Sequence, residues 1–201
     1  MKSIEKAQNL LPLGYLFLVV LGILKESVFF HQIGINILKY SSIMDILISP
    51  IATLTSSPII LTFVFLLFVF HFCLPSILYR YKHKKWIIKR FELDKMKGEQ
   101  SEGVLKRLFL NAAISILSIM LLSFFLGFGI GGGQIIAKRI KGNKLKYNYK
   151  LNYNSGESED IYLIESNSAY YFYVAKGNPA VKIAPVGAIK SIELTKNKML
   201  E

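Results

Sequence analysis

The sequence predicts an α-helical membrane part followed by a small all-β domain. Three apolar segments are long enough to cross a bilayer, since about 20 helical residues span its hydrocarbon core. Basic residues, which give the chain a net charge of +12, gather beside these segments, as in the loops of membrane proteins. After Gly142 the hydrophobic period changes from helical to two, as in half-buried strands. We therefore expect a membrane part at residues 1–140 and a β-domain at residues 144–195.

The first predicted span, residues 10–30, contains Lys25 and Glu26 near its end. Ionisable residues within a span indicate function by default, whereas at a helix end they mark the interface, because long side chains reach the headgroups. We favour the interfacial interpretation. We expect no good ion pair between these two residues, because neighbours on a helix point to different faces.

The moderately apolar segment 33–54 follows, with polar residues such as Asp45 interspersed, and it predicts an interfacial or re-entrant helix. The second span, residues 59–78, is the clearest, with Pro58 suited to a first helical turn. It contains His71 and, two positions on, Cys73, a poor spacing for one metal on a helix. We interpret His71 as a packed polar residue and predict no metal site and no cofactor.

The third span, residues 108–130, is rich in small residues. Ser123, Gly127 and Gly131 recur every four residues, so they share a helix face that allows close packing in lipid or lines a pore. The run Gly131–Gly133 either extends this face or breaks the helix. Asn111 is a further polar candidate inside the span.

The loop at residues 80–107 is strongly basic and partly amphipathic. Because the loop directly adjoins two spans, we favour anionic lipid as its partner over nucleic acid. The residues expected at the lipid surface are Lys84, Lys85, Trp86, Lys89 and Arg90.

The β-domain begins with strict alternation from Leu145 to Tyr153. Four shorter strand candidates follow, between turn residues, at residues 161–164, 169–174, 180–184 and 190–194. Five short strands predict a closed or half-closed barrel, and we expect its tyrosines to pack in the barrel rather than to stack on ligands.

A glycine-rich third helix followed by a small β-domain resembles the layout of small-conductance mechanosensitive channels. The matching residues are Ser123–Gly133 and the stretch Lys182–Gly187, which looks like the late strand and turn of that family's Sm-like domain. The resemblance implies an SH3/Sm-like barrel and a ring of helices around a pore. The long basic loop and the lack of a following α/β domain depart from the family.

Two function hypotheses follow. The first is a homo-oligomeric ion channel or pore-forming component with the β-domain as collar or sensor. The alternative is a membrane-anchored binding or regulatory module whose β-domain recognises a ligand or partner. We expect no enzymatic activity, because no set of catalytic groups stands out by spacing.

The basic residues give conflicting predictions for the topology of this multi-pass, inner-membrane protein. The loop at 80–107 carries the largest basic bias, which favours a cytoplasmic loop, a cytoplasmic N-terminus and a β-domain outside. The basic residues after the third span and the channel resemblance favour a β-domain inside. Both blocks lie inside only if residues 108–136 enter and return on one side.

Overall fold

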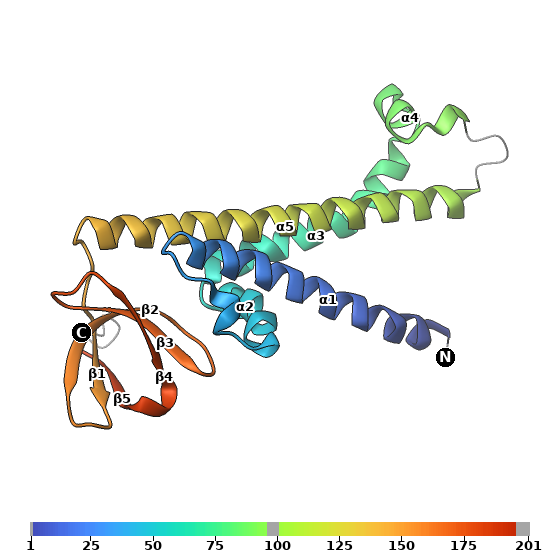
Figure 1. The fold of residues 1–201 in the computed structure, drawn as a ribbon. Helices are drawn as coiled ribbons and strands as arrows, with labels where there is room; N and C mark the ends of the chain where they lie inside the picture. Colours follow the sequence, from blue (N-terminus) through green and yellow to red (C-terminus); the bar gives the residue numbers. More distant parts are fainter. Residues whose placement is uncertain (1, 96–100, 196–201) are drawn as a thin grey trace. The chain divides into compact units, whose positions relative to one another are not determined.

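The computed structural model describes residues 2–95 and 101–195, within which five α-helices precede a five-stranded sheet (Figure 1). The predicted order of helices followed by a small β-domain is therefore confirmed. Contacts divide the chain into two compact units. One unit joins the segment up to Ile51 with the segment from Phe125 onward, and the other is Ala52–Phe124. The predicted domain boundary after residue 140 stays a prediction.

Three helices are long and apolar enough to cross a membrane: α1 (Lys2–His31), α3 (Pro58–Arg80) and α5 (Glu102–Lys141). Each overlaps one predicted span. Large apolar side chains of α3 face outward, and Phe63, Phe65 and Phe72 keep 51%, 64% and 78% of their surface exposed. A surface of this kind is stable against lipid tails and costly in water.

Helix α2 (Ile43–Thr55) is shorter than the predicted helix at 33–54, because Gly34 turns the chain after α1 with a φ of +79°. A short 3-10 helix, η1 (Ile37–Lys39), fills the interval. The start of α2 is capped reciprocally: the Ser42 hydroxyl donates to Asp45 Oδ2 at 2.7 Å, and the Asp45 amide donates back to Ser42 Oγ at 3.1 Å.

The unit Ala52–Phe124 contains α3, the short helix α4 (Lys85–Phe91) and the first part of α5. Its core is a cluster of five buried apolar side chains, Leu78, Ile87, Leu93, Leu105 and Phe109. The predicted amphipathic stretch therefore turns Ile87 inward as part of a helix. Residues 96–100 of the basic loop lie outside the described residues.

Helix α5 is one helix of 40 residues that continues through Gly131–Gly133. The alternative in which the glycine run breaks the helix is therefore wrong, and the helix makes no turn within residues 108–136. Forty residues form about 60 Å of helix, which exceeds the hydrocarbon thickness of about 30 Å.

The sheet is antiparallel throughout, with strand order β4-β3-β2-β1-β5. The strands are β1 (Tyr149–Tyr153), β2 (Ser158–Ser166), β3 (Tyr170–Ala175), β4 (Val181–Pro185) and β5 (Ile189–Leu194). A 3-10 turn, η3 (Val186–Ala188), precedes β5. The predicted first strand from Leu145 is too long, because β1 begins only at Tyr149, which pairs with Leu194 at the end of β5. One further backbone hydrogen bond, from the Thr195 amide to the Asn148 carbonyl at 2.9 Å, extends the pairing beyond the strands.

One face of the sheet carries its core, centred on Leu151, Ile161 and Tyr173. Tyr173 is 2% exposed, and its hydroxyl lies 2.6 Å from that of Tyr153, which agrees with packing for these two tyrosines. In β2 the pairing with β3 shifts between Leu163 and Glu165, so Ile164 forms a β-bulge. Bulges re-aim the side chains around them.

Candidate functional site

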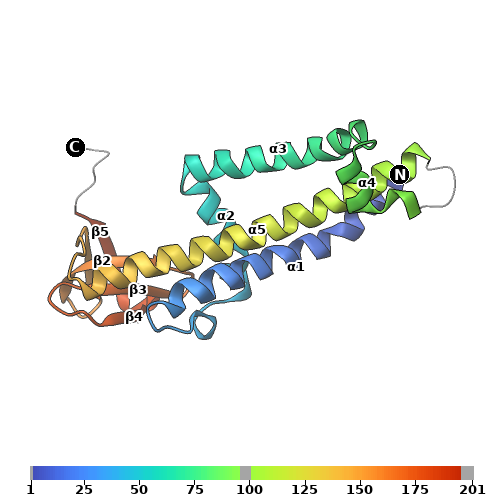
Figure 2. The same cartoon turned by 90° about the horizontal axis from the view of Figure 1, so that it is seen from above.

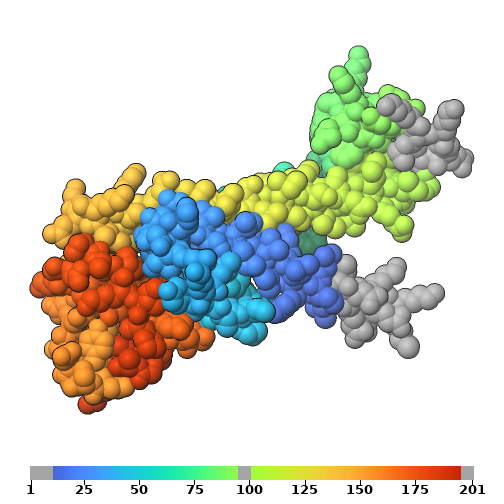
Figure 3. Space-filling view, viewed as in Figure 1, coloured from blue at the N-terminus to red at the C-terminus, as the bar shows by residue number. Residues whose placement is uncertain are grey.

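The sheet packs against the end of α1 and the start of α2 through three neighbouring sets of contacts. We call this region the junction: an ionic cluster around Lys25, an aromatic cluster around Phe172, and polar contacts of Asp45. All three belong to one compact unit. In the space-filling view the end of α1 and the following loop, in blue, lie directly against the sheet, in orange to red (Figure 3).

The ionic cluster joins α1, α2 and β2. Lys25 Nζ lies 2.6 Å from Glu26 Oε1, donates to Ser49 Oγ at 3.1 Å and lies 3.9 Å from Glu165 Oε1. The Ser49 hydroxyl donates to Glu26 Oε1 and so bridges the two residues of α1. Lys25 and Glu26 are 7% and 5% exposed. The expectation that these neighbours would not pair is wrong, because the long lysine chain bends back toward Glu26 and both contact Ser49.

Glu165 enters this cluster from the β-domain. It directly follows the bulge at Ile164, and its side chain keeps about a third of its surface exposed, 34%. Burial of the carboxyl group and the nearby Glu26 carboxylate raise the pKa of Glu165 to about 7, although Lys25 acts in the opposite direction. Two carboxyl groups therefore share one ammonium group, and one of them holds its proton more tightly than an ordinary glutamate.

The aromatic cluster lies beside the charges. Its centre is Phe30 of α1, Ile37 of η1 and Phe172 of β3, which are at most 2% exposed. The rings of Phe30 and Phe172 meet edge to face, with centroids 4.9 Å apart. Such pairs stabilise packing beyond the area that they bury. Ile164 also packs here, so the bulge directs one apolar and one charged residue of β2 toward the helices.

Polar contacts attach the β2–β3 turn to the start of α2. Asp45 accepts hydrogen bonds from the amide and hydroxyl of Ser168, each at 3.0 Å, and Asn167 Nδ2 donates to the Tyr40 carbonyl at 3.0 Å. Burial alone would raise the pKa of Asp45, but the hydrogen bonds from Ser42 and Ser168 outweigh it and lower the pKa below its usual range. Asp45 therefore caps its own helix and holds the sheet.

Two glycines bring α5 against α1 at the same level. A Cβ atom at Gly129 would lie 2.5 Å from the carbonyl oxygen of Lys25, and one at Gly133 would lie 2.4 Å from that of Phe29. The two backbones are thus in contact, and Figure 2 shows this part of α5 running beside the end of α1. Close approach through glycines four residues apart is a common form of packing in membranes.

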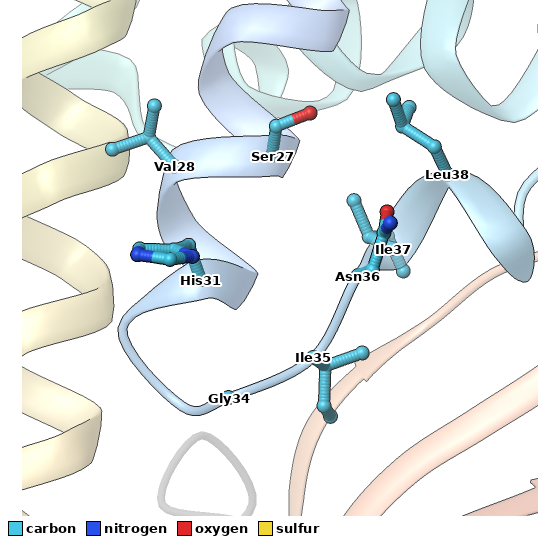
Figure 4. Close-up of a pocket in the computed structure, with 8 residues that line it drawn as sticks. All are labelled: Ser27, Val28, His31, Gly34, Ile35, Asn36, Ile37 and Leu38. Atoms are coloured by element: carbon cyan, nitrogen blue, oxygen red, sulfur yellow. The ribbon is translucent and has the colours of Figure 1, made fainter.

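A pocket of about 600 Å³ lies where α1 turns into η1, lined mainly by apolar side chains together with Ser27, His31 and Asn36. The Ser27 hydroxyl oxygen is buried and has no hydrogen-bond partner among the described residues. Figure 4 shows this hydroxyl pointing away from His31, toward the Leu38 side of the pocket. The pocket borders the junction but shares no residue with the ionic cluster.

The remaining predicted residues are not part of the junction. His71 is 4% exposed, and its Nδ1 lies 2.8 Å from the Leu67 carbonyl of its own helix. Asn111 and Ser123 are exposed. Among the described residues, a Cβ atom at Gly127 or Gly131 would meet nothing within 4 Å, so neither glycine is in close contact with another segment of its unit. The lipid-surface candidates Lys84, Lys85, Trp86, Lys89 and Arg90 are all exposed.

Three parts of this region were not predicted from the sequence: Glu165, Ser49 and the Gly129–Gly133 pair. The position of Glu165 in its strand could have indicated that it has a partner. Ile161 and Leu163 of the same strand face the sheet core, and simple alternation would place Glu165 beside them. A charged residue at an expected inward position calls for a partner. Gly129 and Gly133 also fit a small-residue repeat of four, but nothing in the sequence distinguishes their face from that of Gly127 and Gly131.

Within the described residues, no group of three or more histidine, cysteine, aspartate or glutamate side chains is placed to hold a metal ion. Comparisons of this chain with known protein families, with curated proteins and with solved structures find no match.

Proposed function

We propose that this protein is a membrane-embedded regulatory module in which the β-domain recognises a ligand or partner and transmits its state to helix α1. One observation carries the proposal: a carboxyl group of the sheet, Glu165, meets a buried ion pair inside a candidate membrane span. A β-domain that is merely tethered to the membrane needs no such contact. Ionisable residues within a span are costly and usually functional.

The test is whether a disturbance of the helices reaches the sheet. The full chain is reconstituted in bilayers of short and long acyl chains, which change the tilt of spans, and hydrogen exchange of residues 158–175 is followed. We expect the exchange rate of β2 and β3 to depend on bilayer thickness. The double variant Asp45→Ala, Asn167→Ala should weaken this dependence, because it removes the polar contacts between the β2–β3 turn and the start of α2 and leaves the apolar clusters unchanged.

The matched control is Glu157→Gln, an exposed residue in the turn before β2. It should respond to bilayer thickness like the unmodified protein. Exchange rates of β2 and β3 that are the same in all bilayers would show that the sheet is only tethered, and the proposal would fall.

A second candidate function is a homo-oligomeric ion channel, with the β-domain as collar. The observation that favours it is the open face of Gly127 and Gly131, which is available to a second copy. The strand order, with β5 returning beside β1 after a 3-10 turn, also supports an SH3/Sm-like barrel, as in the mechanosensitive channels that the sequence resembles. Mass measurement in nanodiscs tests this: we expect an oligomer that Gly127→Leu and Gly131→Leu disrupt and Leu122→Ala preserves, and a monomer would contradict it.

We further propose an orientation in the inner membrane, with the N-terminus and the loop at 80–107 cytoplasmic and the β-domain outside. The support is helix α5, which is unbroken between the basic loop and the β-domain. We expect one unbroken helix to cross the membrane once and so to place the loop and the β-domain on opposite sides. Single cysteines at Ser101 and Ser155, in a Cys73→Ser background, are treated in intact cells with an impermeant maleimide. Labelling at 155 alone supports the orientation, and labelling at 101 alone reverses it.

Anionic lipid is the partner that we propose for α4. Ile87 is fully buried, whereas Trp86 is 60% exposed among exposed basic residues, close in sequence to the end of a candidate span. Trp86 is the single tryptophan of the chain, so its fluorescence reports this surface alone. Brominated anionic lipids should quench it more than brominated neutral lipids, and the difference should shrink as salt rises. Equal quenching by both would contradict an anionic partner.

A further inference from the structure

We propose that the ionic cluster of the junction is a proton-binding site, and that proton uptake by Glu165 tightens the docking of the sheet on α1 and α2. The inference rests on the docked junction of the proposed function and names the ligand that regulates it. Its basis is the composition of the cluster, in which two carboxyl groups face one ammonium group: Lys25 and Glu26 are buried, and the side chain of Glu165 is about two-thirds covered.

Among the described residues, only Glu26 and Lys25 interact electrostatically with Glu165, so no second positive charge balances the two carboxyl groups there. Helix α1 contributes Lys25 and Glu26, α2 contributes the Ser49 hydroxyl, and β3 presents Phe172 opposite Glu165. Helix α5, which contacts α1 through Gly129, has no titratable residue between Arg107 and Lys138. The Lys25–Glu26 pair is already satisfied by its own contacts, so Glu165 is the group left to take a proton.

The chemistry is a simple equilibrium: the Glu165 carboxylate takes a proton from water and becomes a neutral carboxyl group. The raised pKa of about 7 is a property of the docked junction, whereas an exposed glutamate titrates near 4.3. Between these values the docked state binds more protons than the undocked state. By linkage, docking is therefore favoured as the pH falls below about 7 and weakened as the pH rises through this window.

The first measurement is an infrared titration of the full chain in nanodiscs with ¹³C-labelled glutamate carboxyl groups. We expect one glutamate to titrate near neutral pH in the unmodified protein and in Glu157→Gln, and this signal to vanish in Glu165→Gln. Glu26→Gln should move it to lower pH, because the charge that opposes ionisation is gone. If every glutamate titrates within about one pH unit of 4.3, the proposal is overturned. A midpoint that shifts when Na⁺ replaces choline would also overturn it, in favour of a metal cation.

The second measurement reports docking itself. In a Cys73→Ser background, the pair Asp45→Cys and Ser168→Cys replaces two side chains in contact, and its rate of disulfide formation measures how often the β2–β3 turn is docked. The rate is measured for the cysteine pair with Glu165→Gln, which imitates the protonated carboxyl group, and for the cysteine pair with Glu165 unchanged. Both are measured at the same pH, so that the effect of pH on thiol reactivity is the same in the two proteins. We expect faster crosslinking in Glu165→Gln at about pH 8 and equal rates at about pH 6.

The outcomes separate the two proposals. Crosslinking at equal rates with and without Glu165→Gln at both pH values would overturn proton-linked docking and leave the docked junction intact. The control is the pair Asp45→Cys and Ser155→Cys, in which the second cysteine lies in the β1–β2 turn. If the pair Asp45→Cys and Ser168→Cys crosslinks no faster than this control at either pH, the docked junction of the proposed function is overturned.

Discussion

The unit Ala52–Phe124 and the unit that contains the sheet differ in the residues that stabilise each unit internally. In the first, five large apolar residues fill the core, and the basic residues of α4 stay at the surface. In the second, glycines bring helix backbones into contact, and charged residues of α1 are buried with partners from α2 and β2. An apolar core stabilises without depending on ionisation, whereas a buried ionic cluster makes packing sensitive to protons and to partner geometry.

The largest effect is expected in the apolar unit. Phe109 is fully buried, so Phe109→Ala should destabilise the packing of α4 on α3 and α5 by about 3–5 kcal/mol. Hydrogen exchange of residues 85–91 in nanodiscs measures this. Phe72→Ala, at a position 78% exposed, is the control and should leave the exchange unchanged. Equal exchange in both variants would mean that the cluster does not hold α4.

The glycine contact should be nearly as sensitive. Gly129→Ala places a Cβ atom 2.5 Å from the Lys25 carbonyl oxygen, so α5 and α1 must separate, at a cost of about 1–3 kcal/mol in thermal stability. Gly127→Ala meets open space and should be neutral or slightly stabilising, because alanine favours helix over glycine. Similar melting temperatures for the two variants would refute the proposed contact between the helices.

Substitution of Asp45 should have a smaller effect on stability. The stabilisation by Asp45 is lost as the pH falls, whereas the docking linked to Glu165 is weakened as the pH rises. Asp45→Asn weakens the cap of α2 and the contact with Ser168, at a cost of about 1 kcal/mol at neutral pH. Because the folded-state pKa of Asp45 is lowered, its contribution is present above the unfolded pKa and is lost as the pH falls through the folded pKa. Thermal melts at several pH values should show the two proteins converging in acid. Asp160→Asn, at the exposed surface, serves as control, and a constant difference at every pH would contradict the role of the charge.

The smallest effect is expected at the basic surface. Lys89→Gln should reduce the preference of Trp86 for anionic lipid by at most about 1 kcal/mol. The quenching ratio between brominated anionic and neutral lipids measures this preference. Lys176→Gln in the β-domain is the matched loss of a charge, and it should not change the ratio. A ratio that both changes reduce equally would point to net charge rather than to α4.

Local patterns in the sequence predicted the spans and most of the sheet. Short runs between turn residues located β3, β4 and β5 to within one residue at each end, whereas residues 161–164 covered only the middle of β2. The junction could not be predicted in this way, because Lys25 and Glu165 are about 140 residues apart and meet only in the folded chain. The choice between two glycine faces on α5 likewise depends on which helix lies beside it, and that choice depends on the tertiary fold.

The buried position of Lys25 and Glu26 also has a consequence for biosynthesis. When α1 leaves the ribosome, Glu165 has not been made, and the glycines of α5 that cover Lys25 come about 100 residues later. At 5–20 residues per second, the interval before Glu165 is made is roughly seven to thirty seconds. During this time α1 carries two charges without their final neighbours. We therefore expect α1 to reach its final position only after the end of the chain has been made.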